Sequence, residues 1–254
     1  MDEYKIKSNE TLSIIPFTDA HVGASTCDYE FLDYWKKVVS RIKGHKRIYC
    51  LGDMLEASSK SVANSAFKQS MDLNEQREYI IDLLYPFKDD IVIYHQGNHS
   101  FRLSKDYDYD IAKDMARELE VPYSMGGHID KFKVNDKNYS IYTHHGKGSA
   151  SRRDLAIGKI IRDTNKISAN IFMVGHLHHA MVYKDYIKSS NGLEPRYYVY
   201  GGAFLNYKSS YADQMALNEV PPAFLIGNIS KNHKIKWTEV DRIDWEKSTE
   251  YNGN

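Results

Sequence analysis

Short apolar runs recur along this chain, and each of them stops abruptly at a polar residue. In the first half, strand-like runs at residues 11–18, 46–51 and 90–96 alternate with amphipathic segments at residues 28–43, 74–87 and 107–120. The first amphipathic segment has apolar side chains at helical spacing, and Asp28 is positioned to cap its first turn. Regular alternation of strands and helices is typical of an α/β fold with parallel strands.

The second half of the chain is richer in strands. Residues 130–143 predict a β-hairpin around the turn at residues 135–138. The pattern then predicts a helix at residues 151–165 and strands at residues 170–174, 181–187, 196–202, 223–230 and 233–240. Because no internal repeat or long linker interrupts this pattern, we expect a single domain over residues 1–245 and a polar tail over residues 246–254.

Composition narrows the possible functions. Lys+Arg and Asp+Glu each number 34, so a formal net charge of zero gives no general reason to expect a nucleic-acid partner, although a local patch stays possible. Cys27 and Cys50 do not have the CxxC spacing of zinc-finger ligands, so the sequence does not predict a zinc finger. No apolar run approaches the roughly 20 residues that span a membrane, and the first residues are too polar for a signal peptide. We therefore expect a cytoplasmic protein with no membrane partner; its oligomeric state is left open.

Metal-capable residues follow five of the strand-like runs. In chain order these are Asp19-Ala20-His21, Gly52-Asp53, Gly97-Asn98-His99, His144-His145-Gly146 and Gly175-His176-Leu177-His178. Ligands of open α/β sheets bind at the carboxyl ends of the strands, so we expect these side chains to converge at one edge. Carboxylate, amide and imidazole groups without a thiolate suit divalent transition metals.

Taken singly, these residues have simpler explanations. An aspartate after a strand, such as Asp19, is usually a turn or cap residue. A lone histidine is more often a hydrogen-bonded polar residue than a ligand, and we interpret His45, His95, His128 and His233 in that way. All five motifs together, each at a strand end, are not expected by chance. The set therefore predicts a metal centre.

The order of these motifs resembles that of the calcineurin-like metallophosphoesterase superfamily. The blocks of the superfamily, D-x-H, G-D, G-N-H, H-G and G-H-x-H, read here as "DAH", "GD", "GNH", "HG" and "GHLH", from Asp19 to His178. The "HGKG" stretch and an arginine soon after the third block resemble small phage and bacterial members. The resemblance implies a four-layer αββα sandwich with two mixed β-sheets and a dimetal site at the carboxyl ends of the strands.

The resemblance also implies a division of the ligands between two divalent metal ions: Asp19, His21 and His178 for one, Asn98, His145 and His176 for the other, and Asp53 as a bridge. His145 is preferred over His144 because the family ligand directly precedes the glycine. His179 is expected outside the ligand set. Manganese, iron or zinc would suit these ligands, with manganese favoured.

The implied activity is hydrolysis of a phosphomonoester or phosphodiester by a hydroxide that bridges the metal ions. His99 is the family's candidate proton donor for the leaving group, and Arg102 is a candidate clamp for phosphate oxygens, although it could equally be a surface arginine. The family usually has an acidic residue after that histidine, or elsewhere, to orient the imidazole. Here the next residue is Ser100, so either another acid has this role or His99 is a weaker catalyst.

Two other functions are consistent with the sequence. A nuclease with the same dimetal centre is suggested by basic residues after the fourth block, namely Lys147, Arg152, Arg153, Lys159, Arg162 and Lys166. A solvated helix face explains these residues more simply, and the zero net charge favours that explanation. A metal-binding scaffold without catalysis is suggested by Ser100. The substrate would depend on the loops at residues 54–72 and 206–222, which we expect to wall or cover the cleft.

Overall fold

The computed structural model describes residues 1–58, 69–149, 152–189, 192–206 and 220–251. The first half alternates strands with helices, as the sequence predicted. Its elements are β2 (Thr11–Phe17), α1 (Tyr29–Arg41), β3 (His45–Cys50), α2 (Leu73–Leu84), η2 (Tyr85–Asp90), β4 (Ile91–His95), α3 (Asn98–Tyr107), α4 (Ile111–Glu118) and β5 (Tyr123–Ser124). Strands β2, β3 and β4 pair in parallel, so their carboxyl ends lie at the same edge.

Helix boundaries in this half follow from local capping. The Asp28 side chain accepts a hydrogen bond from the Phe31 amide, which confirms the predicted cap of α1. Helix α3 was not predicted, and it separates from α4 because Asp108 takes a left-handed conformation (φ 54°) and Asp110 caps the next helix. The single helix expected at residues 107–120 is therefore wrong at its start.

The second half has the expected strands. It consists of β6 (His128–Val134), β7 (Lys137–His144), α5 (Arg153–Thr164), β8 (Ile171–Val174), β9 (Ala180–Ser189), β10 (Gly192–Ala203), β11 (Ala223–Ser230), β12 (Ile235–Asp241) and α7 (Arg242–Tyr251). The predicted hairpin is confirmed by the antiparallel pair β6 and β7. Strand β1 (Asp2–Tyr4), which pairs with β6, and helix α7 were not predicted. Helix α7 begins before the expected boundary at residue 245 and continues into the segment expected as a tail.

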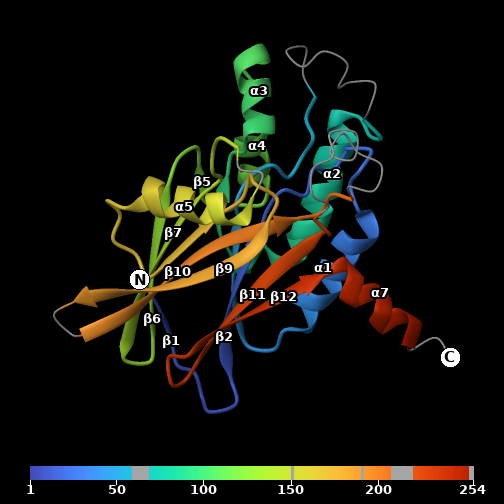
Figure 1. Ribbon diagram of the computed structural model, residues 1–254. Helices are drawn as coiled ribbons and strands as arrows, with labels where there is room; N and C mark the ends of the chain where they lie inside the picture. Colours follow the sequence, from blue (N-terminus) through green and yellow to red (C-terminus); the bar gives the residue numbers. More distant parts are fainter. Residues whose placement is uncertain (59–68, 150–151, 190–191, 207–219, 252–254) are drawn as a thin grey trace.

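All strands belong to one curled mixed sheet of 12 strands, in the order β1-β6-β7-β8-β10-β11-β2-β3-β4-β5, with β9 beside β10 and β12 beside β11 (Figure 1). The two halves are joined where β10 meets β11, at the pair Gly202–Phe224. Strands β7, β8 and β10 run parallel to one another, as β2, β3 and β4 do. Both halves can therefore place carboxyl ends of parallel strands next to each other.

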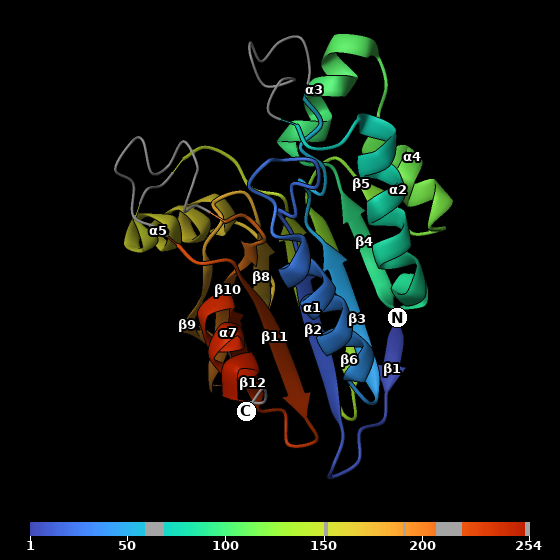
Figure 2. The same cartoon turned by 90° about the vertical axis from the view of Figure 1, so that its right-hand side faces the viewer.

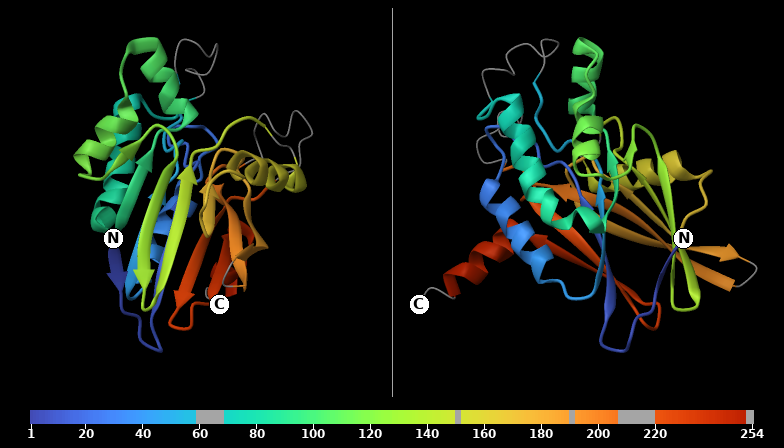
Figure 3. Two further views of the ribbon diagram at one scale, coloured as in Figure 1. Left: turned by 90° about the vertical axis from the view of Figure 1, so that its left-hand side faces the viewer. Right: turned by 180° about the vertical axis from the view of Figure 1, so that it is seen from behind.

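Three groups of buried apolar side chains hold the helices and the halves of the sheet together. Helices α1, α2 and α4 pack on one face of β2–β4, where Trp35 lies against Phe17. The other face of these strands packs on the second half of the sheet, through residues such as Ile14 and Phe132. Helix α5 packs on the outer face of β8 and β10, with Ile160 among the buried residues. Figures 2 and 3 show α1 and α2 on the side of the molecule opposite α5.

The structure confirms a mixed α/β fold, while the four-layer arrangement and the domain boundaries stay predictions. Among the described residues, no helix combines the length and the apolar character needed to cross a membrane.

A buried ion pair joins the two halves of the sheet away from the strand ends. The Arg47 guanidinium on β3 donates to both carboxylate oxygens of Asp130 on β6, at 3.0 and 2.9 Å. Tyr49 donates to the same carboxylate at 2.6 Å, and Asp2 accepts from Arg47 at 2.6 Å. Arg47 and Asp130 are only 5% and 8% exposed. Removing one partner would leave the other charge buried without compensation.

We therefore expect Arg47→Met to lower the free energy of unfolding by about 3–5 kcal/mol, and the double variant Arg47→Met with Asp130→Leu to recover most of that loss. Urea unfolding of both variants measures this. Lys88→Met is the control, because Lys88 pairs at 2.7 Å with the exposed Glu120, and its midpoint should match that of the wild type. An Arg47→Met midpoint equal to that of this control would show that the pair does not stabilise the fold.

Candidate metal centre

The five sequence motifs meet at the carboxyl edge of the sheet. Main-chain hydrogen bonds tie the first two turns together, because the Asp19 amide donates to the Gly52 carbonyl at 3.1 Å and the His21 amide to the Asp53 carbonyl at 3.0 Å. The His176 amide, from the other half of the chain, donates to the Asp19 carboxylate at 2.8 Å. The structure therefore brings together motifs that are up to 157 residues apart in sequence.

Backbone strain is concentrated in these turns. Five of the seven predicted metal ligands have positive φ angles: Asp19 (51°), His21 (46°), Asp53 (50°), His176 (72°) and His178 (55°). Only a few per cent of non-glycine residues adopt this conformation, and each costs of the order of 1–3 kcal/mol. Such strain persists only where the surrounding contacts impose it. Its clustering here marks the edge of the sheet as a functional site.

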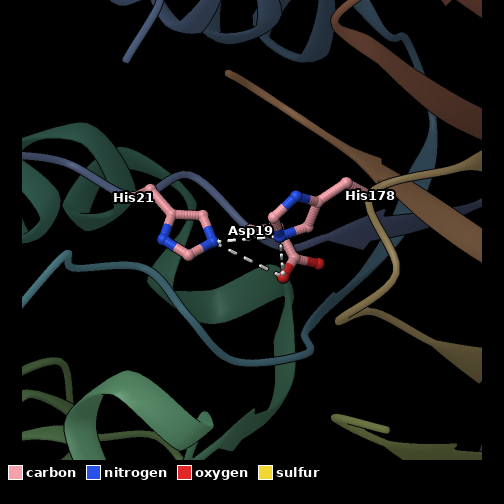
Figure 4. Close-up of side chains that lie close together, drawn as sticks. All are labelled: Asp19, His21 and His178. Atoms are coloured by element: carbon pink, nitrogen blue, oxygen red, sulfur yellow. Dashed lines mark hydrogen bonds and ion pairs between the residues drawn. The ribbon is translucent and has the colours of Figure 1, made fainter. Parts of the chain in front are cut away.

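One ligand group is formed by Asp19, His21 and His178 (Figure 4). Asp19 is fully buried, and its Oδ2 accepts hydrogen bonds from the Thr18 hydroxyl and the His176 amide, at 2.6 and 2.8 Å. Its Oδ1 has no hydrogen-bond partner. The Nε2 atoms of His21 and His178 lie 3.8 and 3.5 Å from this oxygen. A buried carboxylate oxygen that faces two imidazole nitrogens needs a positive charge beside it.

The orientation of His21 suits a metal ion as the source of that charge. Its Nδ1 lies 3.1 Å from a carboxylate oxygen of Glu56, which can only accept, so Nδ1 carries a proton. With a metal ion bound the ring would be neutral, and Nε2, which lies 3.2 Å from Nε2 of His178, would present its lone pair toward Asp19. Ligand atoms about 2.1 Å from one ion lie about 3.0–3.4 Å apart, close to these spacings. The group therefore fits a divalent metal ion.

A second ligand group contains Asp53, Asn98, His145 and His176. Nδ1 of His145 donates to the Leu51 carbonyl at 2.8 Å, so its Nε2 lone pair points toward Asp53 Oδ2 at 3.2 Å and Asn98 Oδ1 at 2.9 Å. Nε2 of His176 donates to a carbonyl oxygen, that of Gly148, at 2.6 Å. Its Nδ1 lies 2.8 Å from the same Asn98 oxygen. Four groups thus direct lone pairs into one space, which also fits a divalent ion.

Asp53 lies between the two groups. It belongs to the set with His145 and His176 and also to a set with His21 and His99, in each of which the ligand atoms lie within 4.8 Å of one another. Its Oδ1 accepts from the His99 amide at 2.9 Å, while Oδ2 faces His145. This position is compatible with the predicted bridging role, which stays a prediction.

The pKa values of these groups are shifted in the direction that favours positive charge in the site. Burial disfavours the ionised carboxyl of Asp19, yet the nearby imidazoles of His178 and His21 hold its pKa well below its usual range. Burial would lower the pKa of His21, but the Asp19 and Glu56 carboxylates raise it to about 10. Burial likewise opposes protonation of His145, and Asp53 raises its pKa to about 9. Protons on the imidazoles thus compensate charges that metal ions would otherwise neutralise.

Glu56 is a site residue that the sequence interpretation missed. Nδ1 of His99 donates to the Glu56 main-chain carbonyl at 2.8 Å and lies 3.6 Å from its carboxylate. The same carboxylate contacts His21, so one side chain orients both a ligand and the candidate proton donor. Burial and the charge of His21 lower the pKa of His99, whereas Asp53 and Glu56 oppose this. The sequence feature that could have identified Glu56 is its position three residues after Asp53. That segment was interpreted only as polar.

The remaining candidates have less direct roles. Ser100 caps α3, since its hydroxyl accepts from the Gly97 amide at 3.2 Å, and it does not orient His99. Arg102, half-buried on α3, lowers the pKa values of Glu56 and His99 by its charge, but its action on phosphate stays a prediction. His144 turns away from the ligand groups and accepts from the Gly146 amide. The loops expected to wall the cleft include residues 59–68 and 207–219, which lie outside the described residues.

A scan with family models and a search of curated proteins found no match. Among solved structures, the chain is similar to vacuolar protein sorting 29 from Cryptosporidium parvum, at 12% identity and a TM-score of 0.47, over 92% of this chain and 100% of that one. A predicted phosphoesterase from Streptococcus pneumoniae is 14% identical, with a TM-score of 0.38, over 91% and 98%. Vps29 complexed with zinc, from Entamoeba histolytica, is also 14% identical, with a TM-score of 0.37, over 90% and 98%.

The calcineurin-like metallophosphoesterase superfamily stays a resemblance that rests on the five sequence motifs. At these identities and TM-scores the likeness says nothing of the reaction, for which the evidence is the arrangement of the side chains.

The glycine of the third motif supports the position of Asp53. A Cβ atom at Gly97 would lie 2.0 Å from Oδ1 of Asp53 and 2.2 Å from its amide nitrogen. Any side chain at this position must displace the carboxylate or the turn that carries it. The same substitution at Gly158, on α5, would meet nothing within 4 Å.

We expect Gly97→Ala to weaken binding of manganese by at least about tenfold, because displaced contacts around metal ligands typically cost that much. Calorimetric titration of EDTA-treated protein with MnCl₂ measures the affinity. Gly158→Ala should bind manganese as the wild type does. Equal affinity of Gly97→Ala and the wild type would mean that Asp53 is not a ligand.

Proposed function

We propose that this protein is a hydrolase of phosphoesters that uses two divalent metal ions. The observation that carries the proposal is the convergence of two lone-pair sets on either side of Asp53, next to a histidine whose orientation is fixed. Asp19, His21 and His178 would hold one ion. Asn98, His145 and His176 would hold the other, and Asp53 would contact both. Manganese, iron or zinc is compatible with these oxygen and nitrogen ligands.

When bound, a pair of such ions supplies Lewis acidity toward phosphoryl oxygens and lowers the pKa of water, which provides a nucleophile at neutral pH. The contribution of the chain is to fix the ligands before substrate arrives. Each aspartate keeps one oxygen in hydrogen bonds to the chain, and its other oxygen would be the one that holds an ion. The left-handed turns then hold these oxygens in place. Ligands fixed in advance need no rearrangement during the reaction.

We propose that His99 protonates the leaving group. Its Nδ1–H bond to the Glu56 carbonyl fixes the ring, so Nε2 is the atom that faces the site, 4.0 Å from Asp53 Oδ2. In the protonated ring, Nε2 can give its proton to the departing oxygen while Nδ1 keeps its bond. The nearby Glu56 carboxylate stabilises the imidazolium. It has the role that the sequence left unassigned when Ser100 followed His99.

The two alternative functions receive less support. Two of the six basic residues that suggested a nuclease are paired within α5 or at its start: Arg152 with Asp154 at 2.8 Å and Lys159 with Asp163 at 3.2 Å. Their charge is therefore partly neutralised for a nucleic-acid backbone. The scaffold hypothesis rested on Ser100, which stands where the family usually has an acidic residue after the histidine. Because Glu56 lies beside His99, the site does contain an acidic residue for that role. Strongly salt-dependent binding of DNA or RNA would favour the nuclease.

We expect Asp53→Asn to lower manganese-dependent hydrolysis of p-nitrophenyl phosphate or bis(p-nitrophenyl) phosphate by at least about 100-fold, since it removes the charge between both ligand groups. The control is Asp108→Asn, an exposed aspartate with a similar backbone angle (φ 54°) at the outer end of α3. Its activity should equal that of the wild type. No metal-dependent turnover by the wild type on a broad panel of phosphoesters would exclude the proposal.

Glu56→Gln tests the proton donor separately from the metal ions. General acid catalysis contributes about 10²–10⁴-fold, and mainly when the leaving group is a poor one. We expect the variant to lose most of kcat with an alkyl phosphoester and much less with the p-nitrophenyl ester, which leaves without a proton. His99→Asn should show the same selectivity. Equal losses on both substrates would assign Glu56 to the metal site alone, through His21.

A further inference from the structure

A cavity of about 120 Å³ lies directly behind the second ligand group. Its walls come from α5, from the ends of β7, β8 and β10, and from the loop that follows His145. Apolar side chains form most of the surface: Tyr142, Ile160, Val174, Leu177 and Tyr200. Neither the ligands nor His99 and Glu56 line this cavity, so the proposed chemistry does not account for it.

Adjacent residues of the chain connect the cavity to the metal centre. His144 and His145 are neighbours at the end of β7, and they point in opposite directions: His145 contacts Asp53 and Asn98, whereas His144 lines the cavity. Gly146 and Gly175 line the cavity and also precede or follow a ligand in sequence. The cavity and the second ligand group therefore share the turns that follow β7 and β8.

Most polar groups in the walls are already engaged with the protein. The Tyr200 hydroxyl donates to the Ala156 carbonyl at 3.1 Å, and the Thr164 hydroxyl donates to the Ile160 carbonyl at 2.7 Å. Lys159 pairs with Asp163 at 3.2 Å. These polar groups therefore have partners within the protein.

Two groups beside the end of β7 can donate hydrogen bonds to a ligand. Nδ1 of His144 accepts from the Gly146 amide at 2.8 Å, so the neutral ring carries its proton on Nε2. Lys147 adds an ammonium group at the same wall. A ligand of this cavity should therefore combine an apolar face with hydrogen-bond acceptors.

The volume matches a single ring. An engineered apolar cavity of about 150 Å³ takes benzene, so about 120 Å³ has room for one six-membered ring. A pyrimidine base meets each requirement, because it is a flat single ring whose edge carries carbonyl oxygens. A purine fills more than this space, and a plain phenyl ring offers no acceptor to the two donors.

We infer that this cavity is the subsite for the organic group of the substrate, and that it selects a pyrimidine ring. The inference rests on the proposed phosphoesterase function, since it names the substrate class of that site as phosphoesters of pyrimidine nucleosides. The ring enters between α5 and β8, with its carbonyl edge toward His144 and Lys147. The phosphate then lies at the ligand groups on the other side of Gly146 and Gly175.

The test is binding of uridine to EDTA-treated protein, followed by NMR chemical shifts or calorimetry, with adenosine as the comparison. Uridine should bind saturably, and adenosine at least about tenfold more weakly. Ile160→Phe, which fills the cavity, should abolish uridine binding. Lys147→Met, at an exposed position that does not affect folding, should weaken it about tenfold, the usual loss for one hydrogen bond to a charged group.

Leu155→Phe is the matched control, because it adds a similar volume to the same helix at a side chain that is 54% exposed. It should bind uridine as the wild type does. Absence of saturable uridine binding, equal binding of adenosine, or unchanged binding by Ile160→Phe and Lys147→Met would each overturn the inference. Because the measurement needs neither metal nor turnover, uridine binding without any hydrolase activity would refute the proposed function and retain the subsite. Hydrolysis of phosphoesters without uridine binding would do the reverse.

Discussion

Two buried aspartates create the condition on which the rest of this site depends. Asp19 and Asp53 are 0% and 2% exposed, and each has one oxygen that accepts from a main-chain amide while the other faces imidazole nitrogens. Ionised carboxylates in such an environment are stable only beside positive charge. The imidazoles around them are held by carbonyl or carboxylate acceptors on their far sides, so their lone pairs face inward. The geometry is that of a site built for cations.

The same residues are unfavourable for the stability of the fold. The left-handed turns at five predicted ligands cost free energy. So do the converging acidic groups and the glycines at which neighbouring atoms approach the backbone closely. Compensation comes from elsewhere, through the apolar layers around Trp35 and Ile14 and through the Arg47–Asp130 pair between the halves of the sheet. Five of the non-glycine residues with positive φ lie at this edge, and others, such as Asp108, lie in turns elsewhere in the described part of the chain.

Much of the fold follows from local sequence. Strands such as β2 and β8 are short apolar runs that end at a polar residue, and α1 has both its periodicity and its Asp28 cap. The convergence of the ligands was predictable because parallel strands end at the same edge.

Other features depend on distant contacts and could not be predicted. Strand β1 has only three residues and exists because it pairs with β6. Helix α3 begins at a ligand motif, where sequence indicated a turn. Glu56 belongs to the site because a turn brings it beside His21 and His99, and no periodicity reports that contact.

The bond between the His176 amide and the Asp19 carboxylate has a consequence for how the chain matures. It spans 157 residues and unites the first long strand with the eighth. During synthesis the amino-terminal half can form its parallel strands, but it holds an incomplete set of ligands until β8 has left the ribosome. Contacts of such large sequence separation form late and slowly. Completion of both ligand groups would thus be a late event in biogenesis.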